Sequence, residues 1–102
     1  MECPIEKTCK MIGSKWTILI LRELIYKQDR MGFNELQKAL RGISPKTLST
    51  RLKELEKNKI ITRTVHSDPL RVEYSLTESG KALKNVENSM KEWCEKWVFK
   101  HD

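Results

Sequence analysis

Residues 33–58 read FNELQKALRGISPKTLSTRLKELEKN, and this stretch decides the fold. Asn34 can cap a short helix, which would end at a glycine-containing turn. Ser44 and Pro45 then supply a cap hydroxyl followed by a proline at the first helical position, the clearest helix start in the chain. Two helices joined by such a turn predict a helix-turn-helix over about residues 34–58.

The second of these helices, over residues 44–58, has one apolar side. Leu48, Leu52 and Leu55 recur at positions i, i+4 and i+7 and form a stripe that a core can bury. An α-helix fits the major groove of DNA, where lysine reads guanine and serine or threonine reads base edges or phosphates. We therefore expect DNA contacts from the polar side and its flanks, with a solvated helix face as the alternative. The residues concerned are Ser44, Lys46, Thr47, Ser49, Thr50, Arg51, Lys53 and Lys57.

After this helix the apolar pattern changes from a helical period to alternation. Residues 61–65 and 71–76 predict two strands of a hairpin, joined through the turn signal Asp68-Pro69. We expect Arg63 and Arg71 to point outward, where arginines on a protruding hairpin suit the minor groove or flanking phosphates of DNA. Two solvated arginines are the alternative. The residues expected to face the core are Ile61, Val65, Val72, Tyr74 and Leu76.

Further helices flank this central part. Pro4 suits the first turn of a helix over about residues 4–12, and Ser14 can cap a second helix that is apolar nearly all round and therefore buried. Thr77 can cap one long helix over about residues 78–99. The predicted fold is mainly α (α+β): a winged helix-turn-helix with a two-stranded wing over about residues 61–76 and a further helix at each end.

The C-terminal helix carries an apolar seam that predicts a dimer. Its members recur at spacings of 3, 4, 3 and 4, as in a coiled coil; they are Leu83, Val86, Met90, Trp93 and Trp97. Two tryptophans near the end of a small domain need a partner surface, so we expect a symmetric homodimer built on helices 4–12 and 78–99. Packing of the seam on the chain's own N-terminal helix is the alternative. A dimer would set two recognition helices ~34 Å apart and imply a near-palindromic operator.

Composition limits the function classes. The 102 residues suit one domain, and 20 Lys and Arg against 14 Asp and Glu give a net charge of +6. Eight basic but only four acidic residues lie between positions 41 and 73, which favours a polyanionic partner. No apolar run is long enough for a membrane span and no signal peptide is visible, so we expect a cytoplasmic protein. The chain carries three cysteines and two histidines without metal-like spacing, which predicts no metal and no cofactor.

Two functions other than DNA binding, an enzyme and a protein-interaction module, are alternatives for this chain. A redox enzyme would rest on the cysteines, but the sequence has no Cys-x-x-Cys, no glycine-rich nucleotide loop and no Cys/His/Asp set. Other enzymes have no visible catalytic constellation, so we predict no enzyme. A winged helix that binds other proteins without specific DNA binding is the remaining alternative.

Three segments resemble the HxlR-type regulators, a branch related to MarR regulators. They are the opening Cys3-Pro4-Ile5 with residues 12–24, the helix-turn-helix from Phe33 to Leu55, and Pro69 with residues 71–80. The resemblance covers about residues 3–97 and implies a dimeric prokaryotic transcription factor without catalytic activity. It also places Cys3 where many members carry a cysteine that in some responds to oxidants or electrophiles.

The cysteines also carry expectations of their own. Cys3 can sit at the N-cap of the first helix with Lys7 one turn on, and both features favour the thiolate form of a cysteine. Cys3 is therefore a candidate redox sensor, with an inert thiol as the alternative. We expect Cys9 and Cys94 to be buried small hydrophobes, or Cys94 to be a resolving partner across the dimer. The sequence does not identify a small-molecule effector.

Overall fold

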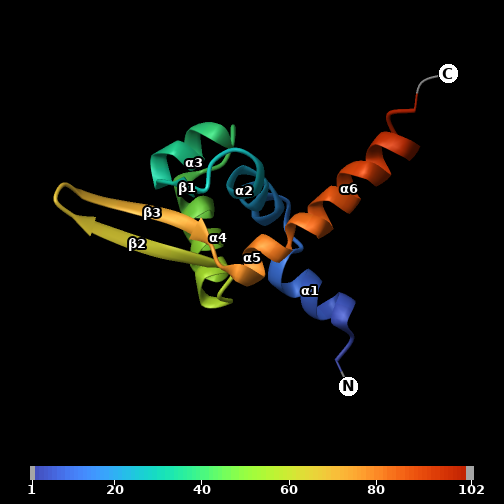
Figure 1. The fold of residues 1–102 in the computed structure, drawn as a ribbon, viewed down its shortest axis with the longest axis horizontal. Coiled ribbons are helices and arrows are strands. Elements are labelled where there is room, and N and C mark those ends of the chain that lie inside the picture. Colours follow the sequence, from blue (N-terminus) through green and yellow to red (C-terminus); the bar gives the residue numbers. More distant parts are fainter. Residues whose placement is uncertain (1, 101–102) are drawn as a thin grey trace.

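A computed structural model describes residues 2–100 (Figure 1). Helices α1 and α2 lead through a two-residue strand to the helix pair α3 and α4, the hairpin β2–β3 and two C-terminal helices. Their bounds are α1 Pro4–Ile12, α2 Lys15–Tyr26, β1 Arg30–Met31, α3 Phe33–Ala39, α4 Pro45–Lys57, β2 Ile61–Ser67, β3 Leu70–Leu76, α5 Glu78–Ala82 and α6 Lys84–Trp97. None of the helices within residues 2–100 is long and apolar enough to cross a membrane.

Side-chain caps fix the starts of the main helices. The Ser44 hydroxyl oxygen accepts a hydrogen bond from the Thr47 N–H at 3.1 Å, and Pro45 occupies the first position of α4, as predicted. Helix α3 begins earlier than expected. Gly32, not Asn34, is its N-cap, because the Glu35 carboxylate accepts the Gly32 N–H at 3.1 Å and draws Phe33 and Asn34 into the first turn.

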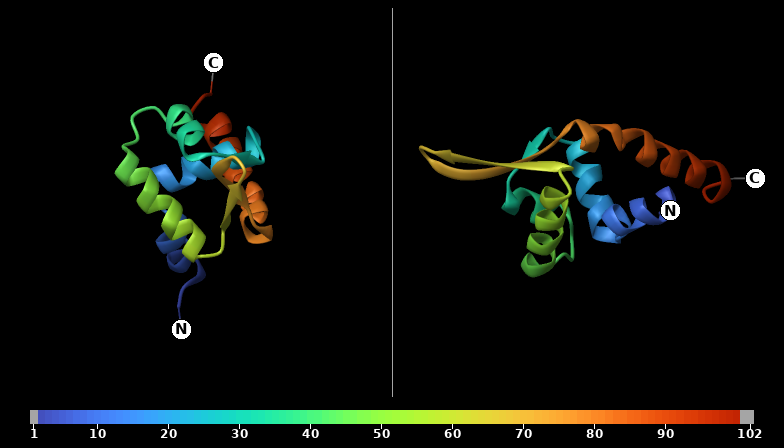
Figure 2. Two further views of the ribbon diagram at one scale, coloured as in Figure 1. Left: turned by 90° about the vertical axis from the view of Figure 1, so that its left-hand side faces the viewer. Right: turned by 90° about the horizontal axis from the view of Figure 1, so that it is seen from below.

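The hairpin belongs to a three-stranded antiparallel sheet in the order β1-β3-β2. Arg30 lies opposite Ser75, and Met31 lies opposite Tyr74, so β1 adds an edge to the base of the wing. The wing strands β2 and β3 extend well beyond the body of the molecule (Figures 1 and 2). The hairpin predicted for residues 61–76 is therefore present, with a third strand at its base.

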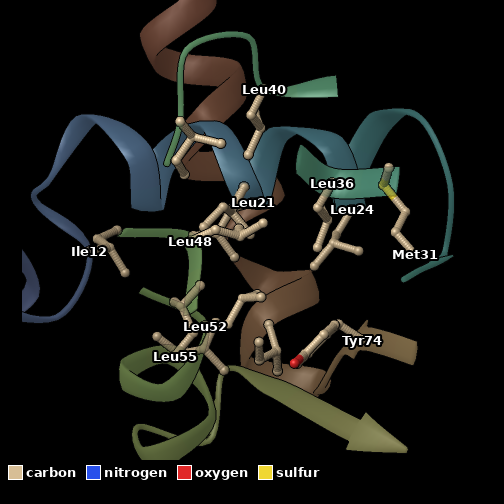
Figure 3. Packing of buried hydrophobic residues seen from close by; sticks show 14 residues of the cluster. Ile12, Leu21, Leu24, Met31, Leu36, Leu40, Leu48, Leu52, Leu55 and Tyr74 are labelled. Atoms are coloured by element: carbon tan, nitrogen blue, oxygen red, sulfur yellow. The ribbon is translucent and has the colours of Figure 1, made fainter. Parts of the chain in front are cut away.

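The core lies where α2 crosses α3 and α4 above the base of the sheet (Figure 3). Leu21 and Leu24 of α2 meet Leu36 of α3 in this core, and Leu48 of α4 completes it. The predicted stripe on α4 is confirmed, since Leu48, Leu52 and Leu55 are all buried. Burial of this kind anchors α4 by one side and leaves its other side free.

The C-terminal helix is broken, contrary to the single helix predicted over residues 78–99. Leu83 separates α5 from α6, and its N–H donates to the Gly80 carbonyl at 3.1 Å, a tighter turn than an α-helix makes. The break has a packing cause. Gly80 is pressed against the Ile60 carbonyl, which fixes α5 to the base of the wing, while α6 extends toward the opposite end of the molecule, where α1 also lies (Figure 2).

Candidate nucleic-acid interface

Helix α4 presents a polar, positively charged side to solvent. Lys46, Thr50, Lys53 and Lys57 are exposed on the side opposite the buried leucines. No ion pair among residues 2–100 involves Lys46, Lys53 or Lys57, so their charges stay uncompensated. An uncompensated row of lysines on an exposed helix attracts polyanions.

Other candidate residues of α4 have partners inside the helix. The Ser44 hydroxyl caps the helix and donates to the Thr47 hydroxyl oxygen at 2.9 Å, so these two side chains bond to each other. Arg51 is half-buried, and its Nη1 lies 3.0 Å from an oxygen of Glu54. Arg51 therefore lies at the edge of the polar side, where its charge is already paired.

The two arginines of the wing lie on opposite faces of the hairpin. Arg63 pairs with Tyr74 and Arg71 pairs with His66, and the alternation of side chains sends these two pairs to different sides. Arg71 lies on the face opposite the residues predicted to face the core, as expected. For Arg63 the same prediction was wrong, because Arg63 lies on the same face as those residues. Arg63 shares its face with Ile61 and Val65, and Val65 is exposed because the wing extends past the core.

Arg63 lies beside α4. A recess of about 370 Å³ between α3, α4 and the hairpin is lined by Ser49, Lys53 and Arg63, together with Phe33, Glu56 and Tyr74. The recess brings two cations from different elements to one surface, with one carboxylate beside them. Strict alternation counted from Ile61 is the signal that would have placed Arg63 here.

Arg71 lies on the other face, farther out along the wing. Its side chain is exposed, and its Nε lies 3.9 Å from Glu73, whose carboxylate is also 2.8 Å from the His66 Nε2. Arg71 thus extends from the outer part of the wing, away from α4, where the backbone of a long DNA ligand can reach it.

The apolar seam of α6 is uncovered in the single chain. Val86, Met90, Trp93 and Trp97 are all exposed, and Trp93 and Trp97 each show about 60% of their surface (61% and 60%). Leu83 differs from the other predicted members, because it packs against the chain's own core. The seam does not pack on α1, as the alternative required, since its four outer members remain exposed.

The opposite side of α6 attaches the helix to α2 through polar groups. The Tyr26 hydroxyl donates to the Asn88 side-chain oxygen, and Glu87 is buried near Arg22. Burial raises the pKa of Glu87 to about 7, and the Arg22 guanidinium opposes this rise only in part. Helix α6 therefore attaches to the body of the molecule through Glu87 and Asn88 and leaves its apolar seam exposed, whereas a helix in a complete monomer usually buries its apolar side.

The cysteines are more accessible than predicted. Cys3 is exposed at the N-cap of α1, as expected, but its neighbour Lys7 lies 3.9 Å from the Glu2 carboxylate. Cys9 is also exposed, so its prediction as a buried hydrophobe was wrong. Cys94 is half-buried in a shallow recess of the seam, beside Met90 and Trp93.

Comparison with known proteins agrees with this arrangement. The sequence matches the profile of the HxlR-like helix-turn-helix family over residues 11–102. The chain belongs to this family. It is 43% identical over 101 residues to the HTH-type transcriptional regulator YdeP of Bacillus subtilis, covering 98% of this chain and 77% of YdeP. It is 38% identical over 97 residues to the regulator YodB of the same organism, covering 93% and 85%.

Solved structures of transcriptional regulators confirm the winged helix-turn-helix fold. Reduced YodB matches with a TM-score of 0.84 and 36% identity over all of both chains. The redox regulator HypR, in its oxidised form, matches with a TM-score of 0.82 and 36% identity, covering 98% of this chain and 99% of that one. The chain is a helix-turn-helix transcriptional regulator, and its family is not one of enzymes.

Within residues 2–100, no group of three or more His, Cys, Asp or Glu side chains is arranged to hold a metal ion. Three cations that no sequence pattern indicated, Arg30, Lys81 and Lys84, line a recess on the far side of the sheet. They lie far apart in sequence and belong to no motif, so only the fold brings them together.

Proposed function

We propose that this HxlR-type chain binds double-stranded DNA as a homodimer, with α4 in the major groove of a near-palindromic operator. The observation that carries the proposal is the exposed row of unpaired lysines on a helix whose other side is anchored in the core. A helix held in this way can enter a groove without unfolding. Such a regulator would act in the cytoplasm.

Lys53 and Arg63 form the inner part of the proposed interface. They line the same recess between α4 and the hairpin, with Ser49 beside them. A phosphate at the edge of the major groove would meet both cations, and Ser49 would reach a base edge or a phosphate oxygen. Lys46, Thr50 and Lys57 would extend the contact along the groove.

The wing forms the outer part of the proposed interface. Arg71 would follow the DNA past the major groove, toward the minor groove or its flanking phosphates. Ser44, Thr47 and Arg51 have partners within α4, so their contribution would be to hold the helix start and its edge in place. At the start of α4 the Lys46 N–H remains suited to a phosphate oxygen, because Pro45 has no N–H and the Thr47 N–H donates to Ser44.

The proposed homodimer rests on the exposed apolar seam of α6. Its exposed seam of Val86, Met90, Trp93 and Trp97 needs a partner, and a second copy supplies a complementary seam by symmetry. Two paired seams would bury four tryptophans and fix the spacing of the two recognition helices.

Cys3 would add a response to oxidants or electrophiles. Its thiol is exposed on α1, the helix that lies at the same end of the molecule as α6 (Figure 1). A change at this thiol would therefore occur near the proposed dimer interface, with Cys94 of the seam as a candidate partner across the dimer. The structures of reduced YodB and of oxidised HypR show that relatives with this fold have been studied in defined redox states.

The test is a fluorescence-anisotropy titration with DNA from upstream of the protein's own gene, at several salt concentrations. Wild type should bind with a steep salt dependence, about −0.9 in log–log slope for each phosphate neutralised. Lys53→Gln should lower the slope by ~1 for each half-site, and Lys10→Gln on α1 should leave it unchanged. A random-operator selection follows if the upstream DNA does not bind, and failure of both would refute DNA binding in favour of a protein-interaction module.

The same assay tests the cysteine. Diamide should weaken binding by wild type and leave a Cys3→Ser variant unaffected. An equal response of the two proteins would show that Cys3 is not the sensor, without touching the DNA-binding proposal. Analytical ultracentrifugation of wild type and Trp93→Ala tests the dimer, and a monomeric wild type at micromolar concentration would refute it.

A further inference from the structure

A second recess lies on the side of the sheet that faces away from α4. It has a volume of about 450 Å³, within the range of small-molecule sites. Three cations line it, Arg30 from β1, Lys81 from α5 and Lys84 from α6, against one acid, Asp29. Ile25 and Leu76, both half-buried, contribute apolar surface. The recess thus combines a net positive charge with an apolar wall.

The cations of this recess have no other partner in the fold. No ion pair among residues 2–100 involves Arg30, Lys81 or Lys84. They come from three elements that are distant in sequence, and the fold places them around one hollow. With only one carboxylate, Asp29, beside them, the three cations repel one another, so an anion bound among them gains from all three.

The strand register separates this recess from the DNA-facing surface. Arg30 and Ser75 are directly opposite in the β1–β3 pair, so both side chains leave the sheet on the same side and line the recess. Met31 and Tyr74, the next pair, leave on the other side and are buried in the core. The three cations therefore do not belong to the surface formed by Lys53 and Arg63.

The recess is also distinct from the apolar seam of α6. Lys84 precedes Val86 by two residues, which places it ~200° around the helix axis from the seam. A dimer built on the seam would leave Lys84 and Lys81 accessible. The recess is bordered by strand β3 of the wing and by the junction of α5 with α6.

We propose that this recess is an effector site for a small organic anion, a carboxylate or phosphate group joined to an apolar body. The acidic group would lie among Arg30, Lys81 and Lys84, with the apolar body against Ile25 and Leu76. Charged hydrogen bonds to the anion would supply specificity over a neutral molecule of the same shape.

The test is an NMR titration of the full ¹⁵N-labelled chain without DNA, at constant ionic strength. The probes are benzoate and phenyl phosphate, and benzamide is the neutral comparison. At least one anion should shift the amide signals of Arg30, Ser75, Lys81 and Lys84 in a saturable manner, and benzamide should not. Because the assay contains no DNA, its failure would leave the proposed DNA binding untouched.

Two double variants complete the experiment. Lys81→Gln with Lys84→Gln should weaken anion binding ~tenfold or more, since each lost charged hydrogen bond has a large effect on affinity. Lys10→Gln with Lys38→Gln removes the same charge from exposed positions elsewhere and should bind like wild type. The proposal is overturned if neither anion shifts these signals, if benzamide shifts them equally, or if the Lys81/Lys84 variant binds as tightly as wild type.

Discussion

The buried carboxyl of Glu87 makes the stability of the fold depend on pH. Glu87 is 8% exposed, and its Oε2 has no hydrogen-bond partner within residues 2–100. The groups around it are Arg22, Tyr26 and Lys27 of the α2 region and Lys91 of α6. Arg22 is already paired with Glu23 at 2.9 Å, which limits what it offers to Glu87.

The magnitude follows from the pKa of Glu87. It is raised from 4.5 to about 7, so between these pH values the folded chain holds a proton that the unfolded chain has released. The stabilisation by this proton is fully present below about pH 4.5 and is lost as the pH rises through about 7. At about 1.4 kcal/mol for each pKa unit, the free energy of unfolding should fall by up to ~3 kcal/mol over this window.

The assay is urea unfolding of wild type and Glu87→Gln from pH 4.5 to pH 8, at one protein concentration. The amide mimics the neutral acid, so the two proteins should be similar at pH 4.5, and the variant should be more stable at pH 8 by up to ~3 kcal/mol. Glu95→Gln, an exposed acid on the same helix, should follow wild type at every pH. A stability difference between wild type and Glu87→Gln that does not change with pH would refute the reasoning.

Three further substitutions test the framework around the interface, each by urea unfolding. Gly80→Ala should cost ~1–3 kcal/mol, because its Cβ would lie 2.3 Å from the Ile60 carbonyl oxygen; a loss no larger than that of Gly32→Ala, whose Cβ meets nothing closer than 3.5 Å, would contradict this. Lys59→Gly should gain ~1 kcal/mol, since Lys59 ends α4 at a φ of 60° that glycine adopts without strain; no gain would mean that the strain is absent. Ser44→Ala should cost ~1 kcal/mol by removing the cap of α4, and Ser89→Ala, at an exposed position within α6, should cost less.

The sequence predicted best the features that local chemistry determines. Ser44 and Pro45 together allow few conformations other than a helix start, and the leucine stripe that follows admits only one buried side. The apolar seam of α6 was predictable for the same reason, because the spacing of Trp93 and Trp97 puts them on one side of any α-helix. Local signals of this kind do not depend on tertiary contacts.

The features that the sequence did not predict depend on contacts between distant residues. No proline near Leu83 signals the break between α5 and α6. The break arises because Gly80 is held against Ile60 while Leu83 packs on the core. Arg63 is an exception: it was assigned outward by its charge, although strict alternation places it on the same face as Ile61 and Val65. The cationic recess of Arg30, Lys81 and Lys84 exists only once β1, α5 and α6 are assembled.

The break at Leu83 makes α6 a lever with a fixed pivot. The 14 residues of α6 span ~20 Å at 1.5 Å for each residue, so a tilt of ~10° at Leu83 would displace the Trp97 end by ~4 Å. Helix α5 would stay in place, because Gly80 and Thr77 hold it to the base of the wing. A small change of angle at Leu83 thus gives a displacement comparable to one base-pair step. In a dimer, such a tilt of both α6 helices would alter the distance between the two α4 helices while the helix-turn-helix and the wing of each chain stay unchanged.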